Sequence, residues 1–197
     1  MILKTNLFKI QHSDLKPQSG CLLISEPFLN EVYFQRAVIL MVECENTGGM
    51  GLVLNKSGEL ILNDLVEGLD KVEEIPVFCG GPVRRDRLFY LHTLGEIIPG
   101  SIKLGENLYI DGDFELILAY LRSGNQIEGR IRFFLGYAGW EYEQLLQEIE
   151  EDAWIVAENK LTSVLQSEGN EFWRKSLLML DRRYHQWLNY PQEPFLN

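Results

Sequence analysis

The segment from Phe34 to Leu54 reads FQRAVILMVECENTGGMGLVL and decides the fold class. Its first part contains the run Ala-Val-Ile-Leu-Met-Val, which is too apolar for a strand with one face in water and is rich in β-forming side chains. It therefore predicts a central strand over residues 34–42. Residues 46–49 predict a turn, and residues 50–54 return as a second strand, expected to be antiparallel to the first.

Short apolar runs on both sides of this hairpin predict further strands. They cover residues 20–25, 76–79, 87–94, 101–104, 108–110, 130–135 and 153–157. The run at 87–94 is expected to pair directly with the run at 76–79, across the break formed by Gly80-Gly81-Pro82. Capping residues and the spacing of apolar side chains predict helices over residues 63–69, from Asp111 or Asp113 to 122, from 140 to 151, over 162–165 and over 171–180. Strands and helices mix without a regular βαβ alternation, which favours an α+β fold with largely antiparallel pairing.

The length of 197 residues suits one domain. We expect an N-terminal arm over residues 1–19, a single domain over 20–180 and an irregular aromatic tail over 181–197. The tail contains Arg182-Arg183 followed by Tyr184 and Trp187. These aromatic side chains could stack on single-stranded nucleic acid, but we expect them to clamp the tail onto the domain.

The chain has 29 acidic and 18 basic side chains, a formal net charge of −11. Affinity for phosphate backbones comes mainly from clustered lysines and arginines, so nucleic acid is an unfavoured partner, and anionic membranes are equally unfavoured. Neither a secretory signal nor an apolar run of about 18 residues is present. We therefore expect a cytoplasmic protein that does not enter a membrane.

The segment GGPVRRDRLFYLH, from Gly80 to His92, is the main candidate binding site. A glycine turn that exposes backbone N–H groups beside guanidinium groups could hold a phosphate or a carboxylate. The alternative is an ordinary hairpin connection with solvated arginines. The candidate anion-site residues are Gly80, Gly81, Arg84, Arg87, His92, Asn55 and Lys56.

No familiar catalytic motif is present in the sequence. It contains neither a nucleotide-binding glycine motif nor the GxSxG and HExxH patterns of hydrolases. On a hairpin, Cys79 and His92 would lie roughly 13 Å apart at about 3.3 Å per residue, too far for a nucleophile and its base. We therefore predict no catalytic residue, no metal and no cofactor, and an enzyme with an unfamiliar site near Asp86, Arg87 and His92 is kept as an alternative.

Read together, several segments resemble the AlgH/YqgE family of bacterial proteins. The matching segments are Leu22-Leu23-Ile24 with Pro27, Gly48-Gly49-Met50-Gly51, Asn55-Lys56, Gly80-Gly81-Pro82, Asp86-Arg87, Phe89, Leu91-His92, Gly136-Tyr137-Ala138, Trp140, Ala153-Trp154 and Trp173-Arg174. They run in the family's order over roughly residues 20–180. The resemblance implies a compact α+β fold with an antiparallel, bifurcated sheet and flanking helices, in a cytosolic bacterial protein.

The resemblance implies no particular reaction. Its label of transcriptional regulator comes from the genetic context of one member rather than from a DNA-binding motif. Our leading hypothesis is a non-enzymatic binding or regulatory module that acts through a protein partner or a small anionic ligand. The alternatives are a regulator that binds nucleic acid directly and the enzyme considered above, and the sequence does not predict an oligomeric state.

Overall fold

The computed structural model describes residues 15–29, 31–160 and 164–191. Within them, ten strands form one sheet in the order β10-β1-β2-β3-β9-β6-β8-β7, with β4 and β5 attached to one side of β9. The strands are β1 (Leu22–Ser25), β2 (Val38–Glu45), β3 (Gly48–Val53), β4 (Leu60–Ile61), β5 (Pro76–Cys79), β6 (Val83–His92), β7 (Ile102–Gly105), β8 (Leu108–Ile110), β9 (Ile131–Trp140) and β10 (Trp154–Ala157). Every pairing is antiparallel except that of β5 with β9, which confirms the expected α+β fold with largely antiparallel pairing.

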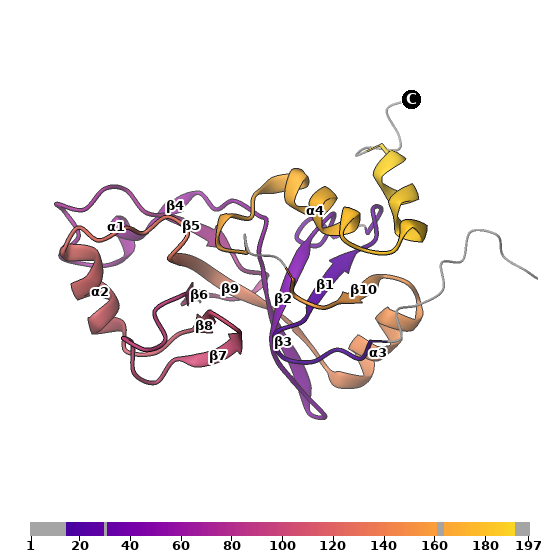
Figure 1. The fold of residues 1–197 in the computed structure, drawn as a ribbon, viewed down its shortest axis with the longest axis horizontal. Helices are drawn as coiled ribbons and strands as arrows, with labels where there is room; N and C mark the ends of the chain where they lie inside the picture. The colour runs from indigo at the N-terminus through magenta and orange to yellow at the C-terminus, as the bar shows by residue number, and fades with distance from the viewer. Residues whose placement is uncertain (1–14, 30, 161–163, 192–197) are drawn as a thin grey trace, which may run out of the picture.

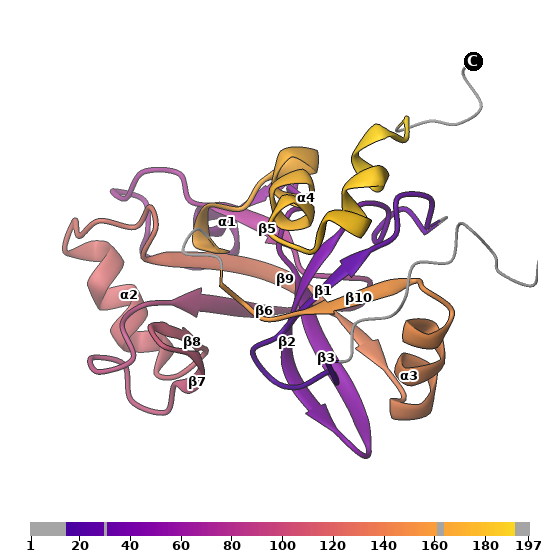
Figure 2. The ribbon, with the colours of Figure 1, turned by 45° about the vertical axis from the view of Figure 1, so that its right-hand side comes forward.

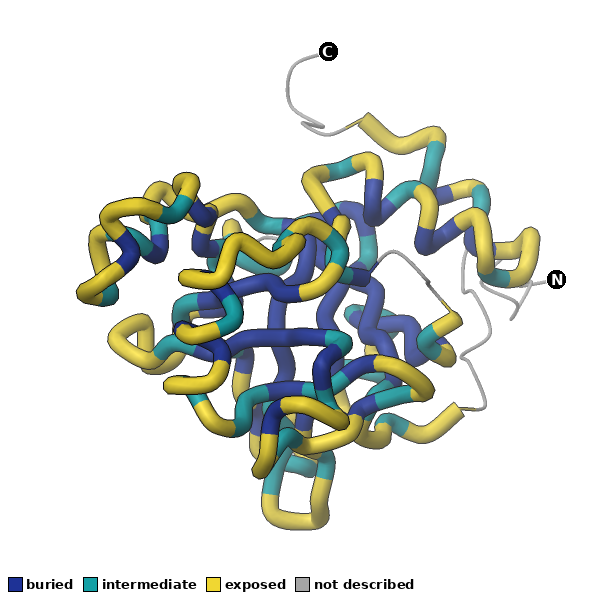
Figure 3. Tube along the Cα trace, turned by 60° about the vertical axis from the view of Figure 1, so that its left-hand side comes forward, coloured by how far each residue is buried: buried dark blue, intermediate teal, exposed yellow. Residues whose placement is uncertain are grey.

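The helices are α1 (Leu62–Leu65), α2 (Phe114–Arg122), α3 (Tyr142–Glu150) and α4 (Gly169–Leu178), with 3₁₀ helices η1 (Val164–Gln166) and η2 (Arg182–Asn189). Strand β9 crosses the molecule, with α2 near one end of it and α3 near the other (Figures 1 and 2). The buried stretches of the chain gather along the middle strands, and the exposed stretches form the connections around them (Figure 3).

The predicted central hairpin is confirmed. Strands β2 and β3 pair antiparallel with Ile39 opposite Val53, and residues 38–42 of β2 are buried. The register shifts between Met41 and Glu43, where the hairpin leaves the core and enters solvent.

Strand β9 gives the sheet its bifurcation. Residues 133–135 of β9 pair with β5 on one edge and with β6 on the other, whereas residues 138–140 pair with β3. The backbone N–H of Val53 donates to the carbonyl of Gly80 at 2.8 Å, so β3 ends against the end of β5 and turns away from β9. The predicted direct pairing of 76–79 with 87–94 is wrong, because β9 lies between these two strands.

The chain passes from one edge of β9 to the other at three glycines. A Cβ added at Gly80 would collide with the carbonyl oxygen of Gly136, and one added at Gly81 would collide with the backbone of Tyr137. Gly136 has a φ of +71°, and a Cβ there would lie 2.5 Å from the oxygen of Gly81. The Gly80-Gly81 pair is therefore a crossing of two backbones in contact rather than a hairpin turn.

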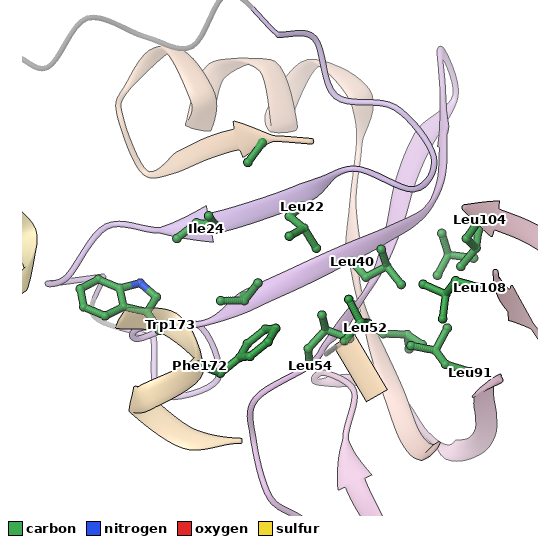
Figure 4. Packing of buried hydrophobic residues seen from close by; sticks show 14 of the residues in the cluster. Leu22, Ile24, Leu40, Leu52, Leu54, Leu91, Leu104, Leu108, Phe172 and Trp173 are labelled. Atoms are coloured by element: carbon green, nitrogen blue, oxygen red, sulfur yellow. The ribbon is translucent and has the colours of Figure 1, made fainter. Parts of the chain in front are cut away.

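The main core lies between the sheet and helix α4. Phe172 and Trp173 of α4 pack with leucines and isoleucines of β1, β2 and β3 (Figure 4). The Nε1–H of Trp173 donates to the carbonyl of Ser25 at 2.9 Å, so the largest fully buried side chain of this core also has its polar atom satisfied.

Two helix predictions have different outcomes. Asp113 accepts a hydrogen bond from the N–H of Leu116 and caps α2, as expected. The helix expected over 63–69 is wrong, because α1 has only four residues. Asn63 instead donates to the carbonyls of Leu69 and Val72, and so braces the loop that follows α1.

The C-terminal segment is more ordered than expected. Residues 182–189 form the 3₁₀ helix η2, and Tyr184 and Trp187 are buried in the main core. Arg36 and Arg174 donate to the carbonyls of Tyr190 and Leu188, respectively, and tie this segment to the domain. Most of the expected N-terminal arm, residues 1–14, and positions 162–163 of the expected helix lie outside the described residues.

The crossing predicts a specific loss of stability on adding a methyl group to β9. Gly136 and Gly124 have nearly equal φ values, +71° and +70°, but only Gly136 has neighbours near its would-be Cβ. Gly124→Ala is expected to lower the free energy of unfolding by about 1–2 kcal/mol through the left-handed backbone alone. Gly136→Ala is expected to lower it by at least about 2 kcal/mol more, because the crossing strands must separate. Urea unfolding measures both losses, and equal losses would contradict a close-packed crossing.

Candidate ligand-binding site

The predicted cationic corner is dispersed in the structure. Arg84 and its ion-pair partner Asp86, 3.1 Å away, are both exposed to solvent. The guanidinium of Arg87 lies over the ring of Phe89, at 4.6 Å from its centroid. The N–H of Gly80 donates to the carbonyl of Leu135 and is not available to an anion. The glycines and the arginines therefore do not form one anion-binding loop.

Asn55 and Lys56 brace the chain before β2. The amide of buried Asn55 accepts from the N–H of Val38 and donates to the carbonyls of Arg36 and Gly169. Lys56 donates through Nζ to the carbonyl of Gln35 at 2.7 Å, and partial burial lowers its pKa. The polar atoms of Asn55 are thus used within the fold.

His92 is fully buried between the rings of Tyr90 and Tyr109. Its Nδ1 accepts from the N–H of Leu94 at 3.1 Å, and its Nε2 lies 2.9 Å from the carbonyl oxygen of Asp111. These contacts assign the neutral tautomer with hydrogen on Nε2, and burial lowers the pKa of the imidazole. Asp86 is exposed and His92 is enclosed, so the two do not share a pocket.

Arg87 is the one predicted site residue that lines a described open groove. This groove has a volume of about 640 Å³ and lies between the β2–β3 hairpin and strands β6 and β8. It is also lined by four carboxylates, those of Glu43, Glu45, Asp111 and Glu141. Arg87 is exposed, so water, salt and the nearby carboxylates screen its charge, which makes this guanidinium a weak site for a small anion.

A different arginine, Arg132 on β9, carries the least satisfied polar group of the described core. Its side chain is only 4% exposed, and its Nη1 donates to the hydroxyl of Ser167 at 2.9 Å. The ring of Phe78 covers the guanidinium, with 3.5 Å between the ring centroid and Cζ. Burial lowers the pKa of Arg132 to about 10, and nearby Glu168 partly opposes this shift. The guanidinium therefore stays protonated at neutral pH.

The other two nitrogens of Arg132 have no partner. Within residues 15–29, 31–160 and 164–191, neither Nε nor Nη2 forms a hydrogen bond, and both are shielded from water. These nitrogens share one edge of the planar guanidinium, so their N–H bonds make a two-donor fork that matches the two oxygens of a carboxylate or phosphate. Arg36 differs, since both of its terminal nitrogens donate, to Asn170 and to Tyr190.

Arg132 lines a cavity of about 430 Å³, which we call the Arg132 cleft. The apolar side chains of Ile75, Pro76, Phe78, Ile127, Ile131, Phe133 and Leu165 make up much of its wall, and Glu73, Glu74, Glu128 and Glu168 also line it. The four glutamates are exposed whereas Arg132 is buried, so the positive charge lies at the bottom of the cleft and the negative charges lie toward solvent. A volume of this size is typical of small-molecule sites.

The sequence reasoning missed Arg132, although a signal was present. Arg132 is the one charged residue in IRFFLGYAGW, the sequence of β9. A charged side chain in an otherwise apolar strand is rare in a core unless it is paired or functional.

The described residues contain no group of three or more His, Cys, Asp or Glu side chains placed to hold a metal ion. The same part of the chain contains no helix long and apolar enough to cross a bilayer.

Comparison with known proteins identifies related sequences and structures. A family model described as AlgH-like matches residues 22–185. The UPF0301 protein of Bacteroides fragilis is 46% identical over 197 residues and covers all of both chains, and that of Chlorobaculum tepidum is 35% identical over 98% of this chain and 100% of its own. The solution structure of the AlgH protein from Pseudomonas aeruginosa has a TM-score of 0.68 at 25% identity, over 92% of this chain and 98% of that one. A crystal structure from Corynebacterium diphtheriae matches in fold, with a TM-score of 0.71 at 19% identity over 96% and 100% of the two chains.

The buried imidazole of His92 predicts a pH dependence of stability. Because its pKa is lower in the folded state than the unfolded value of about 6.5, the unfolded chain takes up a proton first as the pH falls. The contribution of neutral His92 to the stability of the protein is therefore complete above about pH 6.5. Below that pH the free energy of unfolding falls, by up to about 1.4 kcal/mol per pH unit.

Urea unfolding between pH 7.5 and 5.5 measures this effect. His92→Gln is expected to remove that part of the slope. His185→Gln is the matched control, since His185 is only partly buried and its Nε2 lies 3.2 Å from the carbonyl oxygen of Leu180. Equal slopes for wild type and His92→Gln would show that His92 is not held neutral.

Proposed function

The chain belongs to the AlgH-like family, and we propose that it is a non-enzymatic binding module of regulatory type that takes a small anionic ligand at the fork of Arg132. The observation that carries this proposal is the pair of buried guanidinium nitrogens, Nε and Nη2, without a hydrogen-bond partner in the described part of the chain. They belong to a side chain that lines a cavity of ligand size.

A hydrogen-bond acceptor added at this position would lower the free energy of the folded chain. A buried donor without a partner costs about 1–3 kcal/mol, and more when the group is charged. An anion with two oxygens would satisfy Nε and Nη2 together and would also neutralise the buried charge. Binding of this kind stabilises the folded state without any chemical step.

Access to the fork requires a movement of side chains, because both nitrogens are shielded from water. Phe78 and Leu165 line the cleft and are only partly buried. Rotation of such side chains is fast compared with backbone rearrangement. We therefore propose that Leu165 moves aside as the ligand enters, while Phe78 stays on the face of the guanidinium.

The groups around the cleft support binding rather than turnover. Among the described residues that line the cleft, the titratable ones are four glutamates and Arg132. None of the lining residues is a histidine or a cysteine. The hydroxyl of Ser167, next to Arg132, is within hydrogen-bond distance of the carbonyls of Leu54 and Val164. A nucleophile paired with a base, as covalent catalysis requires, is not formed by these groups.

Arg87 defines the competing candidate. It lines the groove beside the β2–β3 hairpin, where its guanidinium is exposed to water and its attraction for an anion is screened. The enzyme alternative near Asp86, Arg87 and His92 lacks a shared pocket, as the exposure of Asp86 and the burial of His92 indicate. Direct binding of nucleic acid is opposed by the net charge of −11.

Titration of the whole protein with acetate and benzoate tests the proposed site. We expect binding to shift the Nε–Hε resonance of Arg132 and to raise the melting temperature. At 100 times its Kd, a ligand adds about 2.7 kcal/mol of stability, equivalent to roughly 5–10 °C for a chain of this size.

Three variants distinguish the two candidates. Arg132→Met should abolish binding while retaining contact with Phe78, and Arg132→Lys should weaken it by about tenfold or more, because lysine keeps the charge and loses the fork. The double variant Arg84→Ala and Arg87→Ala should bind as wild type. Unchanged binding by Arg132→Met, or loss of binding in the double variant, would place the anion elsewhere.

A further inference from the structure

We infer that the ligand of the Arg132 cleft is a zwitterion, namely an amino-acid derivative or short peptide whose free carboxylate meets Arg132 and whose cationic group meets the glutamates above it. This inference rests on the proposed function and names the class of ligand. It follows from the arrangement of charge in the cleft, with one buried guanidinium below four exposed carboxylates.

The guanidinium selects the first group of the ligand. The unpartnered atoms, Nε and Nη2, are two donors on one planar edge, and a carboxylate presents two acceptor oxygens in one plane at matching spacing. Phe78 lies against the face of the guanidinium at 3.5 Å, so the edge, rather than the face, is the part left to a ligand.

The glutamates select against a ligand with more than one negative charge. Four carboxylates and one guanidinium give the lining a net formal charge of −3. A phosphate dianion would gain the fork but would meet this negative field, whereas a carboxylate carries a single negative charge. A cationic group at the other end of the ligand would turn the same field into an attraction.

Three of the glutamates are positioned to receive that cation. Glu128 already accepts a hydrogen bond from Gln166, at 3.5 Å. The side chains of Glu73, Glu74 and Glu168 form no ion pair within the described residues. Glu168 raises the pKa of Arg132, against the effect of burial, and its exposed side chain lines the same cleft.

The walls between the two charged regions suit an aliphatic linker. Pro76, Phe78, Ile127 and Leu165 contribute apolar surface to the cleft, whose volume is about 430 Å³. The methylene groups of a lysine ligand would lie against this surface while its carboxylate and its side-chain ammonium group are both paired. A ligand of one to a few residues is therefore the appropriate size.

Four matched probes, titrated into the full chain by calorimetry, test this class of ligand. They are Nα-acetyl-lysine, Nα-acetyl-norleucine, Nα-acetyl-lysinamide and inorganic phosphate. Nα-acetyl-lysine has both charges, the norleucine derivative lacks the cation and the lysinamide lacks the carboxylate. We expect about millimolar affinity for Nα-acetyl-lysine, roughly threefold to tenfold weaker binding of the norleucine derivative, and no measurable binding of the other two.

A charge-neutralising variant supplies the matched control. Glu73→Gln combined with Glu74→Gln should remove most of the difference between the lysine and norleucine derivatives, because the lysine derivative loses its acidic partners and the norleucine derivative meets less negative charge. Glu143→Gln combined with Glu150→Gln, on exposed positions of α3, should leave both affinities unchanged. The Nε–Hε resonance of Arg132 should move with each carboxylate probe and stay in place with the lysinamide.

The outcomes separate this inference from the proposed function. Equal affinity for the lysine and norleucine derivatives, both dependent on Arg132, would overturn the zwitterion and leave the anion site intact. Binding of phosphate as tight as that of Nα-acetyl-lysine would also overturn it. No binding of any carboxylate probe, or carboxylate binding unaffected by Arg132→Met, would overturn the inference and the proposed function together.

Discussion

The contact between two backbones at Gly80, Gly81 and Gly136 is the constraint on which the arrangement of the sheet depends. It allows β5 and β6 to pair with opposite edges of β9 although only three residues separate them in the sequence. Since β5 occupies the first part of one edge, β3 pairs only with the last part of β9. The two branches of the sheet, each with its own helices, follow from this crossing.

The same crossing creates the surroundings of Arg132. The parallel register places Phe78 beside Phe134, and from there the Phe78 ring covers the guanidinium two residues earlier in β9. Ser167 approaches from the C-terminal part of the chain and takes Nη1, while itself lying close to the carbonyl of Leu54. Three distant segments thus meet at one cation, and they leave one of its edges without an acceptor. The contrast with Arg36 is informative, because there the chain supplies acceptors to both terminal nitrogens and the arginine acts as a brace.

The sequence was sufficient for features set by local patterns, and insufficient for those set by contacts across the chain. The run AVILMV and the glycines after it predicted the β2–β3 hairpin, and Asp113 predicted the start of α2. Gly80-Gly81-Pro82 has the composition of a turn, and composition alone does not show that β9, about fifty residues later, passes beneath it. For the same reason the site was predicted at the exposed arginines of residues 84–87. The sequence gives only one indication of Arg132 as a site residue, namely that it is a single charge in an apolar strand. Whether such a charge is paired depends on Phe78 and Ser167, which no local pattern connects to it.

The burial of Arg132 in an acidic protein also affects which ligands the proposed site would favour. A cation on the surface of a chain with a net charge of −11 would be screened by salt and by its acidic neighbours, as Arg84 is by Asp86. Under an aromatic ring and away from water, the charge of Arg132 is screened much less, and its remaining hydrogen bonds have a fixed direction. The exposed glutamates that line the same cleft would repel an anion without a positive group. In the proposed site, selectivity would therefore depend on the separation of the two charges, since a ligand would be favoured when its negative group reaches the buried guanidinium and a positive group stays among the exposed glutamates.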